Sequence, residues 1–161
     1  MTKKTKNKFS SKFFALVGGL VVLAVAVITA VILMQPKTFR LDDEYYGSNE
    51  SIDVDKEAYE KLIADKKSFI IMVDKPECYT TANMRQWMSE FPEDMRFKYY
   101  RIMWGEASNS SLHEQIKFVP AVALIHDGKV VDFLDADSDE DAPMYNDPTA
   151  LQNWIREYIE F

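Results

Sequence analysis

Apolar positions change their spacing several times along the chain, and each spacing is typical of a different element. The run from Phe13 to Met34 is apolar throughout and carries no charge. After Asp53, apolar residues recur every three or four positions, which is the period of an amphipathic helix. The next run, "SFIIMVD" at 68–74, is short, continuous and rich in β-branched residues, as in a buried strand. Continued to the C-terminus, the same reasoning predicts helices over 53–67, 79–91, 108–118 and from Asp147, and strands over 68–74, 95–103, 121–125 and 130–134.

The order of these elements predicts an α/β fold with a mixed sheet flanked by helices. The early strands alternate with helices, and such crossovers place neighbouring strands parallel. The last two strands flank "HDGK", whose Asp-Gly pair suits the tight turn of an antiparallel hairpin. The final helix has Asp147 as its predicted N-cap and Pro148 in its first turn.

The uncharged run predicts one N-terminal transmembrane helix over 13–34. As a helix it would span about 33 Å at roughly 1.5 Å per residue, the thickness of a bilayer core. Five lysines lie in the basic tail at 1–12, which places the tail in the cytoplasm and the rest of the chain outside the membrane. The chain is thus predicted to be a single-pass protein of the cell membrane. A cleaved signal peptide is the alternative, because "AVA" at 24–26 fits the small-residue pattern of a cleavage site.

The outer part of the chain divides into a polar linker and a domain. Residues 35–52 carry turn formers and are predicted to be a stalk, with a short strand near Phe39–Leu41 as a variant of that prediction. Residues 53–161 form the domain. The chain of 161 residues has a formal charge of -7, but without the five N-terminal lysines 14 basic residues face 26 acidic ones. Such a surface repels phosphate backbones, which argues against nucleic acid as a partner.

The segments around Cys78 and Pro120 resemble those of the thioredoxin-like superfamily over about residues 53–161. Cys78 follows an apolar strand and begins a helix. Pro120, in "FVPA", directly precedes another apolar strand, and that strand ends in the Asp-Gly hairpin. Members of this family place a cis-proline at this point, beside the reactive cysteine. The resemblance therefore implies a thioredoxin-like sheet with a cis bond before Pro120.

The resemblance also implies where a partner binds. Family members hold extended substrate chains at the backbone edge beside the cysteine. Carried over to this chain, that groove comprises Tyr79, Thr80, Val119 and Pro120, and it would receive a protein partner or a thiol/disulfide substrate.

The active-site motif departs from the family pattern. Two cysteines separated by two residues are usual, whereas this chain reads "CYTT", and Thr81 occupies the position of the second, resolving cysteine. Cys78 is the only cysteine of the chain and the candidate nucleophile. A buried acid lies on the preceding strand in the family, and Asp74 is an offset candidate for it.

One thiol cannot complete a dithiol cycle, because a second thiol must resolve the mixed disulfide. We favour a membrane-anchored, extracytoplasmic, non-catalytic module that binds proteins or acts as an accessory. The alternative is monothiol thiol-disulfide exchange, in which Cys78 attacks and an external thiol resolves. A structural disulfide to another chain is a third reading. Whether the protein is an enzyme therefore stays open at this point.

No cofactor and no metal ion is predicted. Aspartates alternate in the acidic loop at 135–147 as in a calcium loop, but Glu140 stands where glycine is needed and Asn146 where the bidentate glutamate is needed. Weak calcium binding is left open. His113 and His126 are isolated in the sequence and lack the neighbours of a zinc site.

Overall fold

The computed structural model describes residue 17 and residues 38–161. Lys37–Phe161 form one compact unit. The predicted basic tail at 1–12 and, except for Val17, the predicted transmembrane helix at 13–34 lie outside the described residues. In the part that is described, no helix combines the length and the apolar character needed to cross a membrane.

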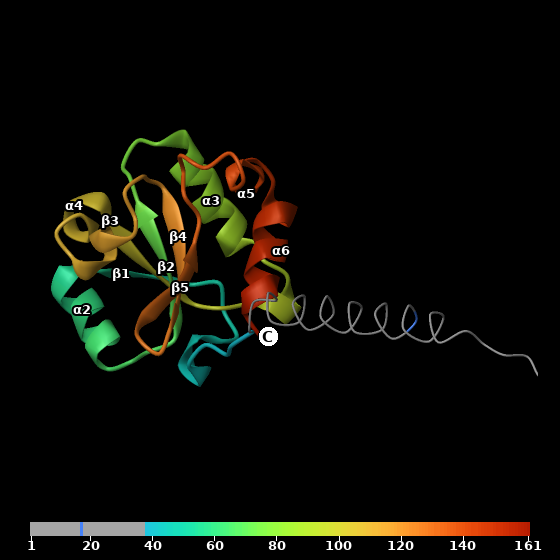
Figure 1. The fold of residues 1–161 in the computed structure, drawn as a ribbon, viewed down its shortest axis with the longest axis horizontal. Coiled ribbons are helices and arrows are strands. Elements are labelled where there is room, and N and C mark those ends of the chain that lie inside the picture. Colours follow the sequence, from blue (N-terminus) through green and yellow to red (C-terminus); the bar gives the residue numbers. More distant parts are fainter. Residues whose placement is uncertain (1–16, 18–37) are drawn as a thin grey trace, which may run out of the picture. The chain divides into compact units, whose positions relative to one another are not determined.

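A five-stranded mixed sheet forms the centre of the domain (Figure 1). Its strands are β1 (Ser51–Val54), β2 (Phe69–Asp74), β3 (Tyr99–Met103), β4 (Ala121–His126) and β5 (Lys129–Phe133). They are ordered β1-β3-β2-β4-β5. β3 runs parallel to both β1 and β2, whereas β4 runs antiparallel to both β2 and β5. Every residue of β2 is buried, because helices cover this strand on both faces, and the apolar run of its first five residues fits that position.

Helices cover both faces of the sheet. They are α2 (Lys56–Ala64), α3 (Tyr79–Ser89), α4 (Trp104–Ala107), α5 (Ala142–Asn146) and α6 (Pro148–Tyr158). In Figure 1, α2 and α4 lie on one side of the sheet and α3 and α6 on the other. The predicted N-cap of the final helix is confirmed, because Asp147 accepts a hydrogen bond from the N–H of Thr149 at 2.8 Å. Asp55 caps α2 in the same way, accepting from the N–H of Ala58 at 2.8 Å.

The buried faces of the two long helices follow the predicted spacing. Met84 and Met88 of α3 are buried, as are Leu151, Trp154 and Ile155 of α6. These side chains cover one face of β2 and β4 with apolar atoms, and their removal from water is the main favourable term in folding.

The described chain begins as part of the domain and not as a stalk. Phe39, Leu41 and Tyr45 are buried in the core, and a 3₁₀ turn spans Asp43–Tyr45. From residue 38 onward the structure therefore differs from the linker expected at 35–52. The reason is that this segment buries single apolar side chains between polar turns, which leaves no helical or strand period to detect.

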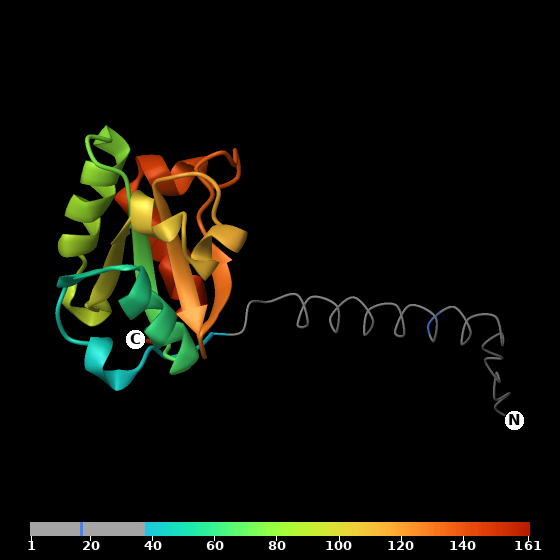
Figure 2. The same cartoon turned by 90° about the vertical axis from the view of Figure 1, so that its left-hand side faces the viewer.

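The first described residues pair with the C-terminal end of the chain. The N–H of Phe39 donates to the carbonyl of Tyr158 at 2.8 Å, and the N–H of Glu160 donates to the carbonyl of Phe39 at 2.9 Å. Phe39 and Ile159 thus form a parallel bridge. Figures 1 and 2 both show the C-terminus beside the cyan segment that starts the domain.

The edge strand β1 and the segment at 108–118 also differ from the sequence prediction. β1 was missed because it is an edge strand whose first three residues are exposed, so it shows no alternation of apolar and polar positions. The helix predicted over 108–118 is wrong: only a 3₁₀ turn forms there, at Ser111–Glu114. Ser108, Asn109 and Ser110 turn their side chains back to the carbonyls of Gly105 and Ala107, and such bonds compete with helix formation. A third 3₁₀ turn, Glu93–Met95, precedes β3.

Candidate functional site

Cys78 lies where β2 passes into α3. The chain leaves β2 at Asp74, turns through Lys75–Glu77 and begins α3 with Cys78 as its N-cap. Glu77, directly before the thiol, has a φ of +61°. This left-handed conformation costs a residue other than glycine about 1–2 kcal/mol, so the turn is held by its surroundings.

The start of α3 stabilises a thiolate. The backbone N–H of Thr81 contributes most to lowering the pKa of Cys78, and the Thr81 hydroxyl and the N–H and hydroxyl of Thr80 add to it. Partial burial of the sulfur works in the opposite direction, but the net pKa lies below the ordinary value. The neutral thiol makes no capping hydrogen bond, whereas a thiolate is a stronger acceptor for these donors.

Thr81 lies beneath the thiol and not on the surface. Its side chain is fully buried, and its Oγ1 has no hydrogen-bond partner among the described residues. The same hydroxyl is close enough to the sulfur to lower the pKa of Cys78. It therefore lies near the sulfur without forming an aligned hydrogen bond, so its donor is free for an ionised sulfur.

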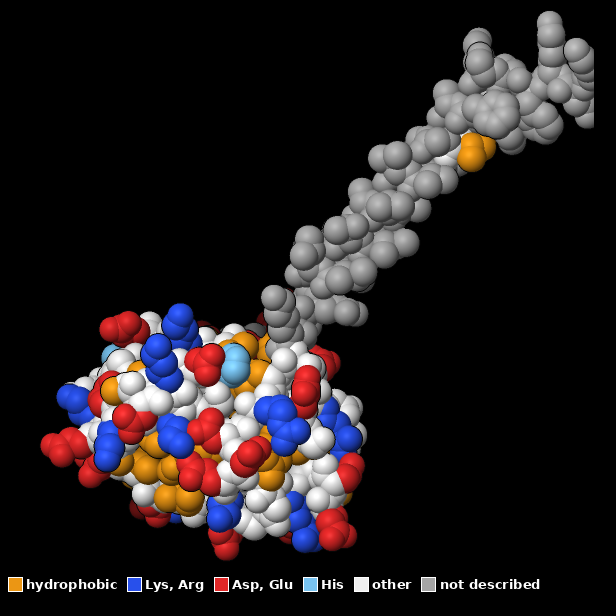
Figure 3. All heavy atoms as spheres, turned by 90° about the horizontal axis from the view of Figure 1, so that it is seen from below, with side chains coloured by type: hydrophobic (Ala, Val, Ile, Leu, Met, Phe, Trp, Pro, Cys, Tyr) orange, Lys and Arg blue, Asp and Glu red, His pale blue; other side chains and the backbone are white. Residues whose placement is uncertain are grey.

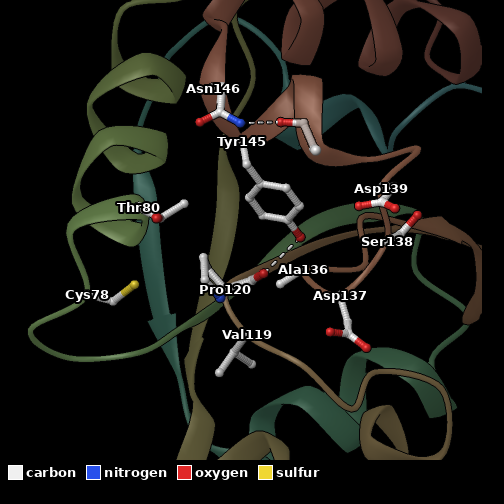
Figure 4. Close-up of a pocket in the computed structure, with 11 residues that line it drawn as sticks. Cys78, Thr80, Val119, Pro120, Ala136, Asp137, Ser138, Asp139, Tyr145 and Asn146 are labelled. Carbon is white, nitrogen blue, oxygen red and sulfur yellow. Dashed lines mark hydrogen bonds between the residues drawn. The ribbon is translucent and has the colours of Figure 1, made fainter.

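A groove of about 520 Å³ opens beside the thiol (Figure 4). One wall comes from the start of α3, the floor from the segment before β4, and the other wall from the loop after β5 together with α5. Figure 4 shows the sulfur on one side of Pro120 and the carboxylates of Asp137 and Asp139 on the other. The lining residues are Cys78, Thr80, Val119, Pro120, Ala136, Asp137, Ser138, Asp139, Ala142, Tyr145 and Asn146.

The hydroxyl of Tyr145 lies between the floor of the groove and the wall that follows β5. Its hydroxyl lies 2.9 Å from the carbonyl oxygen of Pro120 and 2.9 Å from that of Leu134, and it can donate its single proton to one of them at a time. Burial raises the pKa of Tyr145, and the carboxylates of Asp141 and Asp135 raise it further. The hydroxyl therefore remains protonated and available as a donor at neutral pH.

The segment before β4 presents unpaired backbone. The Val119–Pro120 peptide bond is cis. Among the described residues, neither the N–H nor the C=O of Val119 makes a backbone hydrogen bond. Val119 lines the groove, where an extended chain could pair with these two groups as an added strand would.

The structure brings most of the predicted site residues together. Cys78, Thr80, Val119 and Pro120 line one groove. Tyr79 does not line it, and its side chain is 81% exposed.

The sequence did not predict the wall formed by the loop after β5, which contains Asp137 and Asp139, and by Tyr145 of α5. A topological signal could have found it. Because β5 runs antiparallel to β4, the end of β5 must return to the edge of the sheet at which β4 begins, beside Pro120.

Asp74 is buried but does not line the groove. Its Oδ2 lies 3.4 Å from a guanidinium nitrogen of Arg85 and 3.8 Å from one of Arg101. Arg101 also pairs with Asp53 at 2.6 Å. The offset candidate for a buried acid is therefore the centre of an ion-pair network beneath the turn.

The acidic loop uses two of its carboxylates to hold its own backbone. Asp141 accepts from the N–H of Asp135 at 2.7 Å, and Asp135 accepts from the N–H of Asp137 at 2.9 Å. Within residues 38–161, no group of three His, Cys, Asp or Glu side chains gathers as a metal site would require.

Of the comparisons with known proteins, only the one with solved structures bears on the fold. The sequence matches no protein-family model, and no curated protein matches it. Among solved structures, thioredoxin O1 of Arabidopsis thaliana in its oxidised state is similar with a TM-score of 0.52 at 13% identity, over 69% of this chain and 99% of that one. Thioredoxin of Plasmodium falciparum is similar with a TM-score of 0.49 at 15% identity, over 67% of this chain and 95% of that one. The order of the strands, the position of Cys78 and the first of these likenesses show that the domain has a thioredoxin-like fold.

Proposed function

We propose that the domain binds extended polypeptide segments in the groove beside Cys78 and that Cys78 acts on them as a monothiol. The observation that carries the proposal is the position of the sulfur: it borders a groove, begins a helix, and has its pKa lowered by the donors of Thr81 and Thr80. A reactive thiol needs both access and thiolate character, and this environment supplies both.

The exchange step follows ordinary thiol-disulfide chemistry. The Cys78 thiolate attacks one sulfur of a disulfide, the disulfide bond breaks, and the other sulfur leaves as a thiolate. The product is a mixed disulfide between Cys78 and the partner. Thr81 cannot resolve it, since a hydroxyl does not replace a thiol in this reaction, and an external thiol must attack the mixed disulfide to regenerate Cys78.

A non-catalytic binding module is the second candidate, and the residue at position 81 favours it. Thr81 stands where a dithiol enzyme has its resolving cysteine, and its methyl and hydroxyl groups are packed into the core. In that case the unpaired backbone of Val119 would still bind an extended chain, and Cys78 would only contribute to the wall.

We further propose that residues 13–34 anchor the domain in the membrane. The support is the uncharged run and the lysines that precede it. In the described domain, Phe39 pairs with Ile159 and Asp42 with Ser68, at the end of β2 opposite to Cys78. Alkaline extraction of membranes tests the anchor: release of the full chain into the soluble fraction would contradict it.

The reactivity of Cys78 decides between the two functions. The full-length chain in non-ionic detergent is mixed with the neutral disulfide dithiodipyridine, and the release of thiopyridone is followed at mildly acidic pH. We expect the folded chain to react faster than the same chain unfolded in urea, because only the folded chain lowers the pKa of Cys78.

A folded thiol that reacts no faster than the unfolded one would remove the exchange function and leave the binding module. Cys78→Ser is the control for the signal. Recovery of the same bound proteins with wild type and with Cys78→Ser would likewise favour binding without exchange.

A further inference from the structure

The charged side chains of the groove are all acidic. Of its lining residues, Asp137 and Asp139 carry charge, and none of the eleven is Lys, Arg or His. Among the described residues, neither carboxylate forms an ion pair. Other aspartates of the domain are neutralised by bases: Asp42 by Lys67, Asp53 and Asp74 by Arg101, and Asp94 by Arg156.

The loop is built so that these two carboxylates face the groove. Asp135 and Asp141 are engaged with backbone N–H groups of the loop, and Tyr145 ties its start to the segment before β4 through the carbonyl of Leu134. Asp137 and Asp139 make no comparable side-chain bond in the described residues. They are therefore not needed to hold the loop, and both are exposed.

Three chemical features thus lie around one groove. The first is the thiol of Cys78, the second is the unpaired backbone of Val119, and the third is the pair of carboxylates opposite the thiol. Small side chains, namely Ala136, Ser138 and Ala142, flank the carboxylates and leave space beside them. An extended chain lying along Val119 would pass between the sulfur and the carboxylates.

We propose that the groove selects extended polypeptide segments that carry lysine or arginine, with the cationic side chain against Asp137 and Asp139. This inference rests on the proposed function of the groove as a polypeptide site and adds the chemistry of the partner. A divalent ion fits less well, because calcium takes six to eight oxygen ligands and the groove offers two carboxylates.

The charge of the whole domain acts in the same direction and must be controlled for. Residues 38–161 contain 13 Lys and Arg against 26 Asp and Glu, so cationic segments are attracted over a longer range as well. A test must therefore separate the two carboxylates of the groove from acidity in general. Glu57 and Asp65 of the α2 region are exposed acids outside the groove, and they also make no ion pair among the described residues.

The experiment measures the binding of three fluorescent peptides of equal length, in which lysine, glutamine or glutamate alternates with threonine. The protein is the full-length chain with Cys78→Ser, in non-ionic detergent, so that no covalent adduct forms. Fluorescence anisotropy gives each dissociation constant at low and at high salt. We expect the lysine peptide to bind about tenfold more tightly than the glutamate peptide, the size expected when two exposed carboxylates contribute. High salt should reduce the ratio.

Two double variants locate the effect. Asp137→Asn with Asp139→Asn should lower the preference for lysine to about twofold, which is the remainder due to long-range charge. Glu57→Gln with Asp65→Asn changes the net charge equally and should leave the tenfold ratio in place. Equal losses in both double variants would overturn the inference, as would a ratio near one in the parent chain or binding of none of the peptides. Displacement of the lysine peptide by calcium at constant ionic strength would overturn it in favour of a cation site.

The outcome is independent of the exchange function. The 2,2′ isomer of dithiodipyridine is uncharged at the mildly acidic pH of that assay and reports on Cys78 alone. A reactive thiol with no preference for lysine would leave exchange standing and remove the inference. A preference for lysine with an unreactive thiol would do the reverse and would leave a binding module selective for basic segments.

Discussion

The amino end of β2 and its carboxyl end differ in how their polar groups are satisfied. At the amino end, the N–H of Ser68 donates to Asp42 at 3.2 Å, and the hydroxyl of Ser68 lies 3.1 Å from His126 and accepts from the N–H of Asp127 at 3.1 Å. Lys67 pairs with Asp42 at 2.9 Å. At the carboxyl end, the hydroxyl of Thr81, the backbone of Val119 and two carboxylates lack partners among the described residues. We call these the closed edge (Asp42, Lys67, Ser68, His126, Asp127) and the open edge (Cys78, Thr81, Val119, Asp137, Asp139).

The contrast shows which end of the sheet is built for stability. Figure 3 views the domain from the side of the closed edge, where basic and acidic side chains lie interspersed. A polar group without a hydrogen-bond partner lowers the free energy of unfolding. Proteins retain such groups where a bound molecule can supply the missing partner. The polar groups of the open edge therefore contribute less to the free energy of unfolding than those of the closed edge. Substitutions at the two edges should change that free energy by different amounts.

The largest effect is expected at the hairpin of the closed edge. Gly128 has a φ of +72°, and a Cβ added there would overlap the carbonyl oxygen of Ile63. Gly128→Ala should lower the free energy of unfolding by about 4 kcal/mol, since strain and overlap add. Gly47→Ala is the control, because Gly47 also has a positive φ, +96°, but has no atom within 4 Å of a new Cβ. It should cost about 1 kcal/mol. Urea unfolding measures both, and equal losses would contradict the packing of α2 on the hairpin.

Substitution of one phenylalanine at each edge by alanine compares the stability of the two edges directly. Phe39 is 6% exposed and stacks on His126 with ring centroids 4.6 Å apart, whereas Phe118, beside the open edge, is 48% exposed. Phe39→Ala should cost about 3 kcal/mol, and Phe118→Ala should stay within about 0.5 kcal/mol. The same urea titration checks this. A small loss for Phe39→Ala would mean that the segment at 38–42 behaves as the stalk first expected.

Substitution of Asp74 tests its ion pairs with Arg85 and Arg101, next to the turn that carries the thiol. Asp74→Asn leaves Arg85 and Arg101 without their shared buried carboxylate and should cost about 2 kcal/mol, because removing one partner of a buried pair is costly. The loss stays below that of a fully buried pair, since both arginines reach solvent. Asp94→Asn removes an exposed pair with Arg156 and should leave the unfolding curve unchanged. Thermal unfolding followed by circular dichroism separates the two variants.

Much of the fold could be predicted from the sequence because the apolar residues of the central helices and strands follow clear patterns. The continuous apolar run of β2, the Asp-Gly turn between β4 and β5, and the spacing along α6 each point to one structure. β1 and the segment at 38–45 could not be predicted in this way, because an edge strand with exposed residues and isolated buried aromatics carry no period.

Half of the candidate site could be predicted in the same way. Cys78 and Pro120 stand out by residue type and by their place beside apolar strands, whereas Asp137 and Asp139 resemble any solvated acidic loop. Asp137 and Asp139 lie at the groove because β5 ends where β4 begins, and because the Tyr145 hydroxyl lies within hydrogen-bond distance of Pro120 and Leu134. Such information depends on tertiary pairing and is absent from local patterns.

Substitutions of Thr81 test the buried, unpartnered hydroxyl of the open edge. Thr81→Val keeps the shape of the side chain and removes its buried, unpartnered hydroxyl, so it should raise the free energy of unfolding by about 1 kcal/mol. It also removes one of the donors that lower the pKa of Cys78, so that pKa should rise. Thr81→Ser keeps the hydroxyl and should lower stability by about 1 kcal/mol through loss of a buried methyl group. Urea unfolding and the pH dependence of alkylation by iodoacetamide measure the two effects. A loss of stability in Thr81→Val would show that the hydroxyl is bonded in the folded protein.

The smallest expected effect is the coupling between the thiol and stability. The pKa of Cys78 is lowered in the folded domain, so folding favours the thiolate. The resulting stabilisation is complete above the pKa of the unfolded thiol, near the ordinary value of 9.0, and is lost as the pH falls through the folded pKa. The difference in free energy of unfolding between wild type and Cys78→Ser should therefore grow as the pH rises through the folded pKa and level off above about pH 9. Other groups titrate alike in both chains and cancel. A difference that stays flat or shrinks with rising pH would mean that the donors of α3 do not stabilise the thiolate, and the open edge would then lack the feature on which exchange depends.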